Sequence, residues 1–352
     1  MDAVQERPAA AVAPPRVTLF WALAVGAAVV AALLAGVLVG PVSIGAGDIL
    51  RSGLARLPFL AVSSPLSAPQ EAIVWEIRVP RVALGALVGA MLALAGTSYQ
   101  GVFRNPLADP YLLGVAAGAG LGATLAIAYG AGGGALVPLA AFAGAVAAVI
   151  AAYAVGRSVG GTRTTATLIL AGVTVAAFLT AVQTFVQQRE SDSIDEIYAW
   201  LLGGLGTGGW HEVAIVAPYC LVAGAILIVH RRALDVLSVG DEEARSLGLD
   251  VSRTRLLVVA AATLGTAAVV SVSGLIGFVG IVVPHLIRLL VSSSYRVIVP
   301  LSIAVGAAFL VLADVVARTA LAPAELPIGV VTAFVGAPFF ALVLRTTRTV
   351  GP

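Results

Sequence analysis

The chain has 352 residues, of which 60% are hydrophobic and only 11% are charged, and its net charge is +2 at pH 7. A soluble domain carries about 25% charged residues, so this composition excludes an ordinary soluble protein and indicates that lipid is the solvent. All 20 basic residues are arginine, which excludes the lysine-bearing phosphate loop G-x-x-x-x-G-K-[ST], so any ATP-driven step requires another subunit.

Apolar stretches long enough to cross a bilayer recur along the chain, because about 20 helical residues cover roughly 30 Å of hydrocarbon. The first follows a polar tail, residues 1–16, and is too long for the apolar region of a signal peptide. No stretches of about 10 residues alternate in polarity, as the strands of a membrane barrel would. The sequence therefore predicts an all-α integral membrane protein with one transmembrane domain at 17–347. Its ten spans are expected at 17–39, 82–100, 111–129, 135–156, 165–186, 213–230, 256–273, 276–291, 297–317 and 327–344.

The arginines favour one orientation of these spans. With both termini cytoplasmic, fourteen of the 20 arginines lie on the inside and six on the outside, which agrees with the positive-inside rule. Two connections are then long, an outer one at 41–80 and a cytoplasmic one at 231–255. Within the spans, Gly114, Gly118 and Gly122 are spaced by four, as are Gly85 and Gly89, and this spacing predicts close helix packing.

The outer connection ends in the sequence IRVPR at 77–81. Pro80 suits the first turn of a helix, and Arg78 and Arg81 lie beside it, with Arg318 at the same surface. Three guanidinium groups there could bind the carboxylates of a docking protein; arginines that only reach to the membrane surface are the alternative. The segment 57–70 contains three prolines and is expected to be a poorly structured insertion.

The cytoplasmic connection contains the sequence DEEARSLGL at 241–249. Acidic residues open the predicted short helix and a glycine stops it. Such a helix at the cytoplasmic face could transmit a push from a soluble motor protein, and a solvated loop helix remains the alternative. The residues of this predicted coupling element are Asp241, Glu242, Glu243, Ala244, Arg245, Leu247 and Gly248.

Few polar residues within the spans carry recognisable chemistry. Asp314 lies one helical turn before Arg318, which favours a structural ion pair over a proton relay. His285 is expected to be packed or hydrogen-bonded rather than a ligand. The G-x-G-x-x-G match at 204–209 follows no strand, so it is rejected as a nucleotide site. The sequence predicts no catalytic residue and no metal site.

Taken together, several segments resemble one known family. They are IRVPR, FRNPLADP (103–110), LLGVAAGAG (112–120), LILAGV (168–173), WLLGGLG (200–206), DEEARSLGL, GLIGFVGIVVPHLIRLL (274–290) and ELPIGVVTAFVGAPFF (325–340). Over nearly the whole chain they are similar to the FecCD or BtuC-like permeases of ABC importers, which take up iron siderophores, haem and cobalamin with the help of a binding protein.

The resemblance implies a homodimer of permeases in the bacterial cytoplasmic (inner) membrane. Two cytoplasmic ATPases, which carry ATP and magnesium, and one extracytoplasmic binding protein complete the implied importer; this chain itself would hold no cofactor, and no nucleic-acid partner is expected. It also implies that Arg78, Arg81 and Arg318 receive glutamates of the binding protein and that 241–249 sits in a cleft of the ATPase.

The family's cytoplasmic gate lies in the loop after the second span, where its motif falls on Asn105 and Leu107. A second gate lies before the fifth span, with Thr164 and Thr165 as the nearest match. The path would be lined by the fifth and tenth spans and by a short outer helix that includes 197–202.

Two other function classes are weaker. An ion-coupled secondary transporter would need acidic residues or unwound helices inside the membrane, and the spans are poor in both. A membrane-embedded enzyme would need a cluster of catalytic residues at one depth. The expected function is therefore the permease of a metal-chelate importer and not an enzyme, with ferric siderophore as the first cargo and haem or cobalamin close behind.

Overall fold

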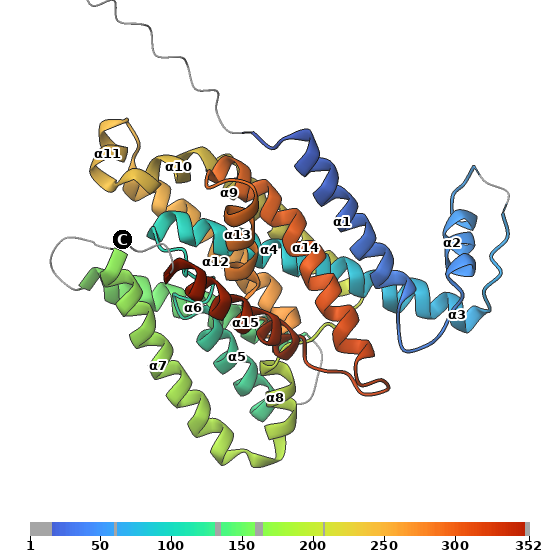
Figure 1. The fold of residues 1–352 in the computed structure, drawn as a ribbon. Helices are drawn as coiled ribbons and strands as arrows, with labels where there is room; N and C mark the ends of the chain where they lie inside the picture. The colour runs from blue at the N-terminus through green and yellow to red at the C-terminus, as the bar shows by residue number, and fades with distance from the viewer. Residues whose placement is uncertain (1–15, 60–61, 131–134, 159–164, 207, 349–352) are drawn as a thin grey trace, which may run out of the picture.

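The chain folds into a bundle of helices with two smaller helical elements at opposite ends (Figure 1). The computed structural model describes residues 16–59, 62–130, 135–158, 165–206 and 208–348. Within these ranges the β pairing is limited to one isolated bridge, between Leu321 and Ala324. The predicted all-α class is confirmed.

Seven helices in the described ranges are long and apolar enough to cross a membrane. They are α1 (Leu19–Leu38), α4 (Val79–Phe103), α6 (Leu136–Ser158), α7 (Thr165–Arg189), α9 (Trp210–Val229), α12 (Val251–Ser273) and α14 (Tyr295–Thr319). Three further apolar helices occupy the remaining predicted spans, namely α5 (Val115–Tyr129), α13 (Val279–Leu290) and α15 (Ile328–Arg348). Each of the ten predicted spans thus corresponds to one helix, with ends that differ by a few residues.

Shorter helices connect these ten. They are α2 (Ala46–Ala55), α3 (Ala68–Ala72), the π-helical turn η1 (Ile73–Arg78), the 3₁₀ turn η2 (Ser191–Ser193), α8 (Ile194–Leu201), α10 (Arg231–Val239) and α11 (Asp241–Ser246). In Figure 1, α2 and α3 project from one end of the bundle and α11 from the other. The continuous helical run of α3, η1 and α4 covers 36 residues, or about 54 Å at 1.5 Å per residue. It is longer than the hydrocarbon layer is thick, so one end extends beyond it.

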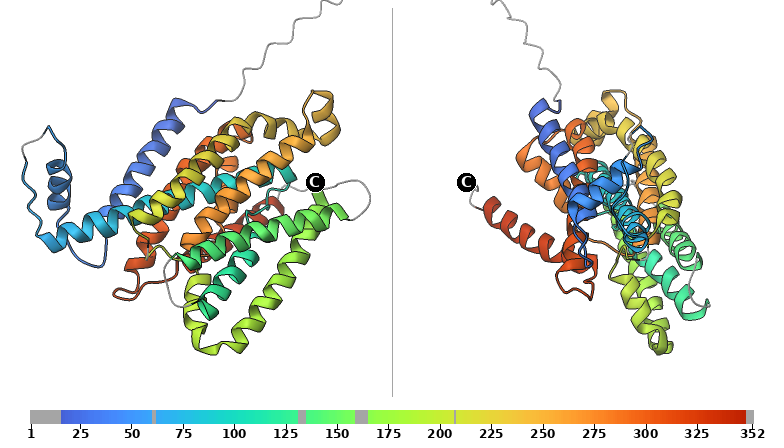
Figure 2. Two further views of the ribbon diagram at one scale, coloured as in Figure 1. Left: turned by 180° about the vertical axis from the view of Figure 1, so that it is seen from behind. Right: turned by 90° about the vertical axis from the view of Figure 1, so that its right-hand side faces the viewer.

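Helix α4 is the centre of the bundle and packs against α9, α12, α13 and α14 (Figure 2). Glycines permit the closest of these contacts. A Cβ atom at Gly89 would lie 2.2 Å from the carbonyl oxygen of Gly306 on α14, and one at Gly96 would lie 2.1 Å from that of Gly280 on α13. The predicted packing role is therefore confirmed at Gly89, where only a residue without a side chain fits.

Helices α5, α6 and α7 form a second group that packs together beside α12. A Cβ atom at Gly118 would lie 2.2 Å from the carbonyl oxygen of Gly144, and one at Gly122 would lie 2.1 Å from that of Ala140. Both contacts join α5 to α6. The four-residue spacing therefore predicted this interface correctly at Gly118 and Gly122. Gly114 instead precedes α5 with a φ of +85°, and a Cβ atom there would meet nothing closer than 3.6 Å.

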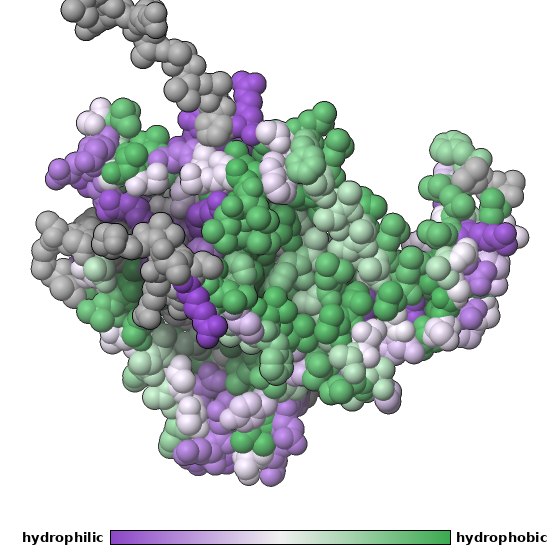
Figure 3. Space-filling model, viewed as in Figure 1, coloured by the Kyte–Doolittle hydropathy of each residue, from purple (hydrophilic) through white to green (hydrophobic). Residues whose placement is uncertain are grey.

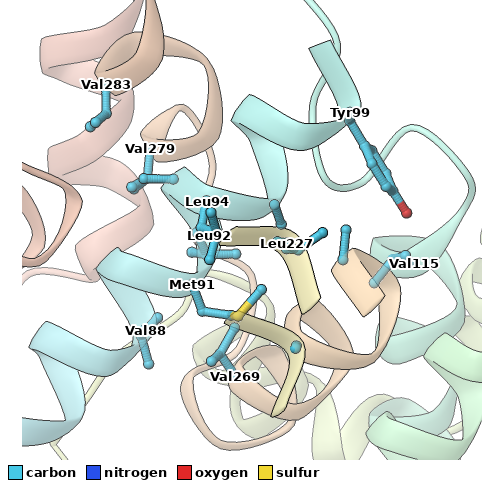
Figure 4. Close-up of a cluster of buried hydrophobic side chains, with 14 of the residues drawn as sticks. Val88, Met91, Leu92, Leu94, Tyr99, Val115, Leu227, Val269, Val279 and Val283 are labelled. Carbon is cyan, nitrogen blue, oxygen red and sulfur yellow. The ribbon is translucent and has the colours of Figure 1, made fainter. Parts of the chain in front are cut away.

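Buried apolar side chains fill the space around α4 (Figure 4). They come from α4 itself, α5, α9, α12 and α13, and include Val88, Met91, Leu92, Leu94, Val115, Leu227, Val269, Val279 and Val283. The fully buried Tyr99 has its hydroxyl group 2.7 Å from that of Thr263. Lipid is as apolar as this core, so removing apolar side chains from water does not drive the helices together inside the membrane. Close packing and such hydrogen bonds hold them together instead.

The surface carries a broad hydrophobic area between more polar ends (Figure 3). Large apolar side chains are exposed on the molecule, including Phe178, which is 67% exposed, and Leu221, which is 71% exposed. A surface of this kind is unfavourable in water and favourable against hydrocarbon. Together with the ten apolar helices, it establishes a multi-pass membrane protein.

Two irregular segments, 104–114 and 274–278, extend the short helices α5 and α13 within the bundle. They meet where the Tyr111 hydroxyl donates to the carbonyl of Ile276 at 3.0 Å and accepts from its N–H at 3.1 Å. Gln100 on α4 donates to the carbonyls of Ala108 and Gly280. Non-helical backbone is tolerated inside a membrane protein when its polar groups are satisfied in this way.

The stretch 41–80, predicted to be an outer connection, contains helices that the sequence did not predict. It contains α2, and the Glu71 carboxylate on α3 joins it together by accepting hydrogen bonds from Ser52 and Ser64 and pairing with Arg56 at 3.4 Å. Within 57–70 the described residues form only turns, bends and irregular backbone before α3 begins at Ala68, so the expectation of a poorly structured insertion stays a prediction. The contacts of Glu71 were not visible in the sequence, because they join positions far apart along the chain.

Candidate functional site

An apolar cavity of about 530 Å³ opens on the face where α8 meets α15. The irregular segment 274–278 forms its floor, and every side chain that lines it is uncharged. The larger lining residues are Leu201, Leu202, Leu275, Phe278, Val330 and Phe334. The sequence predicted a path lined by the short outer helix and by the fifth and tenth spans; α8 and α15 meet at this cavity, whereas α7 does not line it.

Backbone hydrogen bonds hold the walls of this cavity in place. The N–H groups of Ile328 and Gly329 at the start of α15 donate to the carbonyls of Gly203 and Leu202, each at 3.1 Å. Gly203 has a φ of +73°, which favours glycine. A Cβ atom at Gly336 would lie 2.3 Å from the Phe278 ring, so α15 packs directly on the floor.

The faces beside the cavity are apolar and uncovered in the single chain. Phe334 on α15 is 75% exposed, and α7 exposes Leu170, Val173, Phe178 and Phe185. His285 on α13 packs edge-on against Phe339 of α15, with the ring centroids 5.8 Å apart, as expected of a packed residue. In the described part of the chain, no group of three or more histidine, cysteine or acidic side chains could bind a metal ion.

The predicted gate residues lie in the turn that follows α4. Arg104 ends that helix with a φ of +51°, the Asn105 side chain accepts the N–H of Leu107 at 2.9 Å, and the Asn105 carbonyl accepts the N–H of Ala108 at 3.0 Å. Leu107 is 57% exposed at the tip. Of the second predicted gate pair, Thr164 lies outside the described residues. Thr165 is the first residue of α7, and the side chain of Thr165 also lies outside the described part of the chain.

The three predicted docking arginines are buried and have partners within the chain. Arg81 binds Asp314 through a bond of 2.8 Å and the two carboxylate oxygens of Glu325 at 2.9 Å. Arg318 lies 3.6 Å from Asp314 and donates to the carbonyl of Gly36, so the predicted i,i+4 pair is present. Arg78 donates to backbone carbonyls of residues 37, 38 and 42.

These five charged groups form one cluster, with three guanidinium groups against two carboxylates. Glu325 is its outermost member, since its side chain is 41% exposed while that of Arg81 is 7% exposed. Its hydrogen bond with Arg81 lowers the pKa of the Glu325 carboxyl group. In this conformation Glu325, rather than a free arginine, is the exposed group of the cluster, and a docking role for the arginines stays a prediction.

The predicted coupling element forms α11, which ends at Ser246, and Gly248 follows with a φ of +85°. Ala244 is buried against the bundle, whereas Glu242, Glu243 and Arg245 are exposed. Leu247 is an apolar side chain that is 70% exposed on this polar element.

One link at α11 was not visible in the sequence. Asp241 lies 3.1 Å from Arg255 of α12 and 3.7 Å from Arg104, which directly precedes the predicted gate residue Asn105. The ion pair with Arg104 joins residues 137 positions apart, so spacing along the chain gave no signal for it.

Comparisons with known proteins agree on one class. Residues 28–346 match the model of the FecCD transport family. The chain is 40% identical to a cobalamin import system permease protein of Halobacterium salinarum, over 92% of this chain and 95% of the relative. It is 35% identical to an Fe(3+)-citrate import system permease protein of Bacillus subtilis, over 87% and 90%. A solved inward-facing ABC transporter, described as metal-chelate type, superposes with a TM-score of 0.80 at 28% identity and covers 92% of this chain and 98% of its own.

Proposed function

The chain belongs to the FecCD transport family, and from that premise we propose that it is the membrane-spanning permease of an ABC importer that moves a metal chelate into the cell. Its relatives are permease subunits, whose ATPase is a separate subunit, so the chain is not itself an enzyme. The observation that most supports this proposal is the uncharged cavity between α8 and α15. A smooth apolar wall binds a bulky chelate weakly, so the chelate can enter and leave.

A path of this kind requires a second copy of the chain. The cavity and the exposed apolar side chains of α15 lie on one open face of the protomer. Two copies arranged about a two-fold axis would enclose the path and cover these faces, as in a symmetric homodimer. Two ATPases and one binding protein complete the proposed importer.

The outer partner would bind at the charged cluster formed by Arg78, Arg81, Arg318, Asp314 and Glu325. Glutamates of the binding protein are the proposed ligands of its arginines, since carboxylates bind guanidinium groups bidentately. The exposed position of Glu325 supports an exchange, in which an incoming glutamate takes the place of the internal one on Arg81.

The inner partner would bind at α11, at the opposite end of the bundle (Figure 1). Asp241, Glu242, Glu243, Arg245 and Leu247 offer a mixed charged and apolar surface for a cleft of the ATPase. The pair between Asp241 and Arg104 supports a direct connection from α11 to the turn that holds the gate residue Leu107. We place this end in the cytoplasm, with both termini, on the basis of the arginine distribution, and the chain in the bacterial inner membrane.

The cargo is proposed from the relatives. Cobalamin is the first cargo to test, because the cobalamin permease relative has the higher identity and coverage of the two described above. The next cargoes to test are haem and ferric siderophore, the second of which was the first expectation from the sequence alone. All three are bulky chelates that suit an apolar path.

Reconstitution tests this function. The chain is placed in nanodiscs with an ATPase encoded beside it, and ATP hydrolysis is measured with binding protein loaded with cobalamin, haem or ferric siderophore, or left empty. The proposal requires one loaded binding protein to stimulate hydrolysis and to deliver cargo into proteoliposomes. A chain that transports one of these chelates without any ATPase would contradict it.

A further inference from the structure

A second cavity, of about 630 Å³, lies at the end of the bundle that carries α11. It is formed where α6 ends and where α7 and α12 begin. Its charged lining consists of four arginines and two acidic residues, namely Arg104, Arg157, Arg245, Arg255, Asp241 and Glu242. This space is separate from the apolar cavity between α8 and α15, although Asp241, Glu242 and Arg245 also belong to the surface proposed for the ATPase.

The charges around this cavity do not balance. Four guanidinium groups face two carboxylates, which leaves a surplus of two positive charges. Asp241 is already engaged by Arg255 at 3.1 Å and Arg104 at 3.7 Å. Within the described residues, neither Arg157 nor Arg245 forms an ion pair, and Arg157 instead lies over the ring of Tyr153, 5.8 Å from its centroid. These two arginines can therefore bind an anion without breaking an existing pair.

The helix ends add to the positive potential. The cavity is lined by Ala166 and Thr167 in the first turn of α7 and by Ser252 in the first turn of α12. The N-terminus of a helix carries a partial positive charge and N–H groups that favour phosphate and carboxylate. The α12 end is already capped, because the Asp250 carboxylate accepts the N–H of Arg253 at 2.9 Å. The start of α7 and the four guanidinium groups therefore supply most of the positive potential.

Part of the cavity lining is apolar. Leu168, Leu256 and Val259 form this part together with the Tyr153 ring. A ligand with an anionic head and an apolar body matches this combination. Basic pockets between membrane helices are where anionic lipid head groups bind.

We propose that this cavity binds a phosphate-bearing anion, with Arg157 and Arg245 as its main ligands and the Asp241–Arg255 pair as a fixed floor. The phosphate can belong to the head group of an anionic phospholipid from the adjoining leaflet or to a soluble phosphate compound. The site does not depend on the transported cargo, but it shares Asp241, Glu242 and Arg245 with the surface proposed for the ATPase, so the anion is expected to bind the permease in the absence of the ATPase.

The test uses the full chain in phosphatidylcholine nanodiscs doped with phosphatidylglycerol. Native mass spectrometry counts the phosphatidylglycerol that stays bound to the wild type, to the double variant Arg157→Gln/Arg245→Gln and to Arg253→Gln. Arg253 is the matched control, because it is an exposed arginine in the first turn of α12 that does not line the cavity. In a second arm, radiolabelled inorganic phosphate is equilibrated with the same proteins in pure phosphatidylcholine.

We expect the double variant to bind at least about tenfold more weakly than the wild type, since a hydrogen bond to a charged group contributes about 1.5–3 kcal/mol. The control should bind like the wild type, and thermal unfolding should be unchanged in both variants because these side chains are exposed. Retention of phosphatidylglycerol alone identifies a lipid site, and binding of inorganic phosphate identifies a soluble ligand. An equal loss of binding in the double variant and the control, or no binding of either phosphatidylglycerol or inorganic phosphate to the wild type, would overturn the proposal.

Discussion

At the scale of single residues, Gln100 joins three parts of the structure. It is 1% exposed in α4, donates to the carbonyls of Ala108 and Gly280, and accepts from Arg288 at 2.6 Å. Its amide therefore ties an irregular segment and a short helix to the central one. A polar group in such a position costs free energy if its partners are lost.

Replacing Gln100 with leucine should lower the free energy of unfolding by about 1–3 kcal/mol, because two carbonyls and the Arg288 guanidinium group lose a partner. The measurement is the thermal unfolding midpoint in detergent. Gln188→Leu is the matched control, since Gln188 is exposed on α7. Equal stability of the two variants would show that Gln100 only fills space.

Glu325 offers a residue-scale test of docking. Its pKa is lowered by the hydrogen bond from Arg81, so the carboxylate stays ionised at neutral pH, and the stabilisation from this pair is lost only as the pH falls through that lowered pKa. Glu325→Gln leaves the charged cluster with one negative charge fewer. The variant should bind the binding protein several-fold more tightly, most clearly at low salt.

That affinity can be measured by surface plasmon resonance with the permease in nanodiscs, and Glu212→Gln on α9 serves as a charge-matched control. Docking should be insensitive to pH from 6 to 8, since Glu325 remains ionised throughout. Weaker docking of Glu325→Gln would mean that Glu325 holds the arginines in position rather than competing for them.

Among elements, the pairing of α4 with α14 depends on glycine. Gly89→Ala should destabilise the protein by about 1–3 kcal/mol, because its Cβ atom would meet a backbone carbonyl at 2.2 Å. Gly26→Ala in α1 has nothing within 4 Å of its Cβ position and should be neutral. The measurement is the thermal unfolding midpoint of both variants. An unchanged midpoint for Gly89→Ala would imply that α14 can shift away from α4.

The connection between α11 and the gate turn makes a prediction about coupling. Asp241→Arg should reduce transport per ATP hydrolysed, because Arg104 then faces a like charge across the 3.7 Å contact. Adding Arg104→Asp restores an opposite pair and should recover part of the loss. Transport and ATPase rates of the two single variants and the double variant form a mutant cycle; strictly additive effects would exclude a direct link.

The sequence predicted the ten spans because each is a long apolar run, and it predicted the Gly118 and Gly122 contacts from their spacing. It missed the bonds between Tyr111 and Ile276, since 165 positions separate these residues. It also missed the burial of Arg81, because the composition of a helix end does not reveal the internal carboxylates that pair with it. Patterns along the sequence thus predicted the helices, whereas the contacts between the helices became visible only in the structure.

For the whole molecule, α4 joins the two proposed docking ends. Arg81 lies in its first turn and Arg104 directly follows its last residue, about 35 Å apart along the axis at 1.5 Å per residue. One helix therefore carries the outer charged cluster at one end and the contact with α11 at the other. A rigid element in this position can pass movement from the binding protein to the ATPase side.

The measurement that tests the central claim most directly is ATP-dependent uptake of radiolabelled cobalamin into proteoliposomes that contain this chain, its ATPase and its binding protein. Haem and ferric siderophore, each with its own loaded binding protein, are run in parallel. The account predicts that one of these chelates accumulates only when ATP is enclosed with the ATPase, and that omission of the binding protein abolishes uptake. Uptake of the chelate that persists without ATP and follows an ion gradient would contradict it.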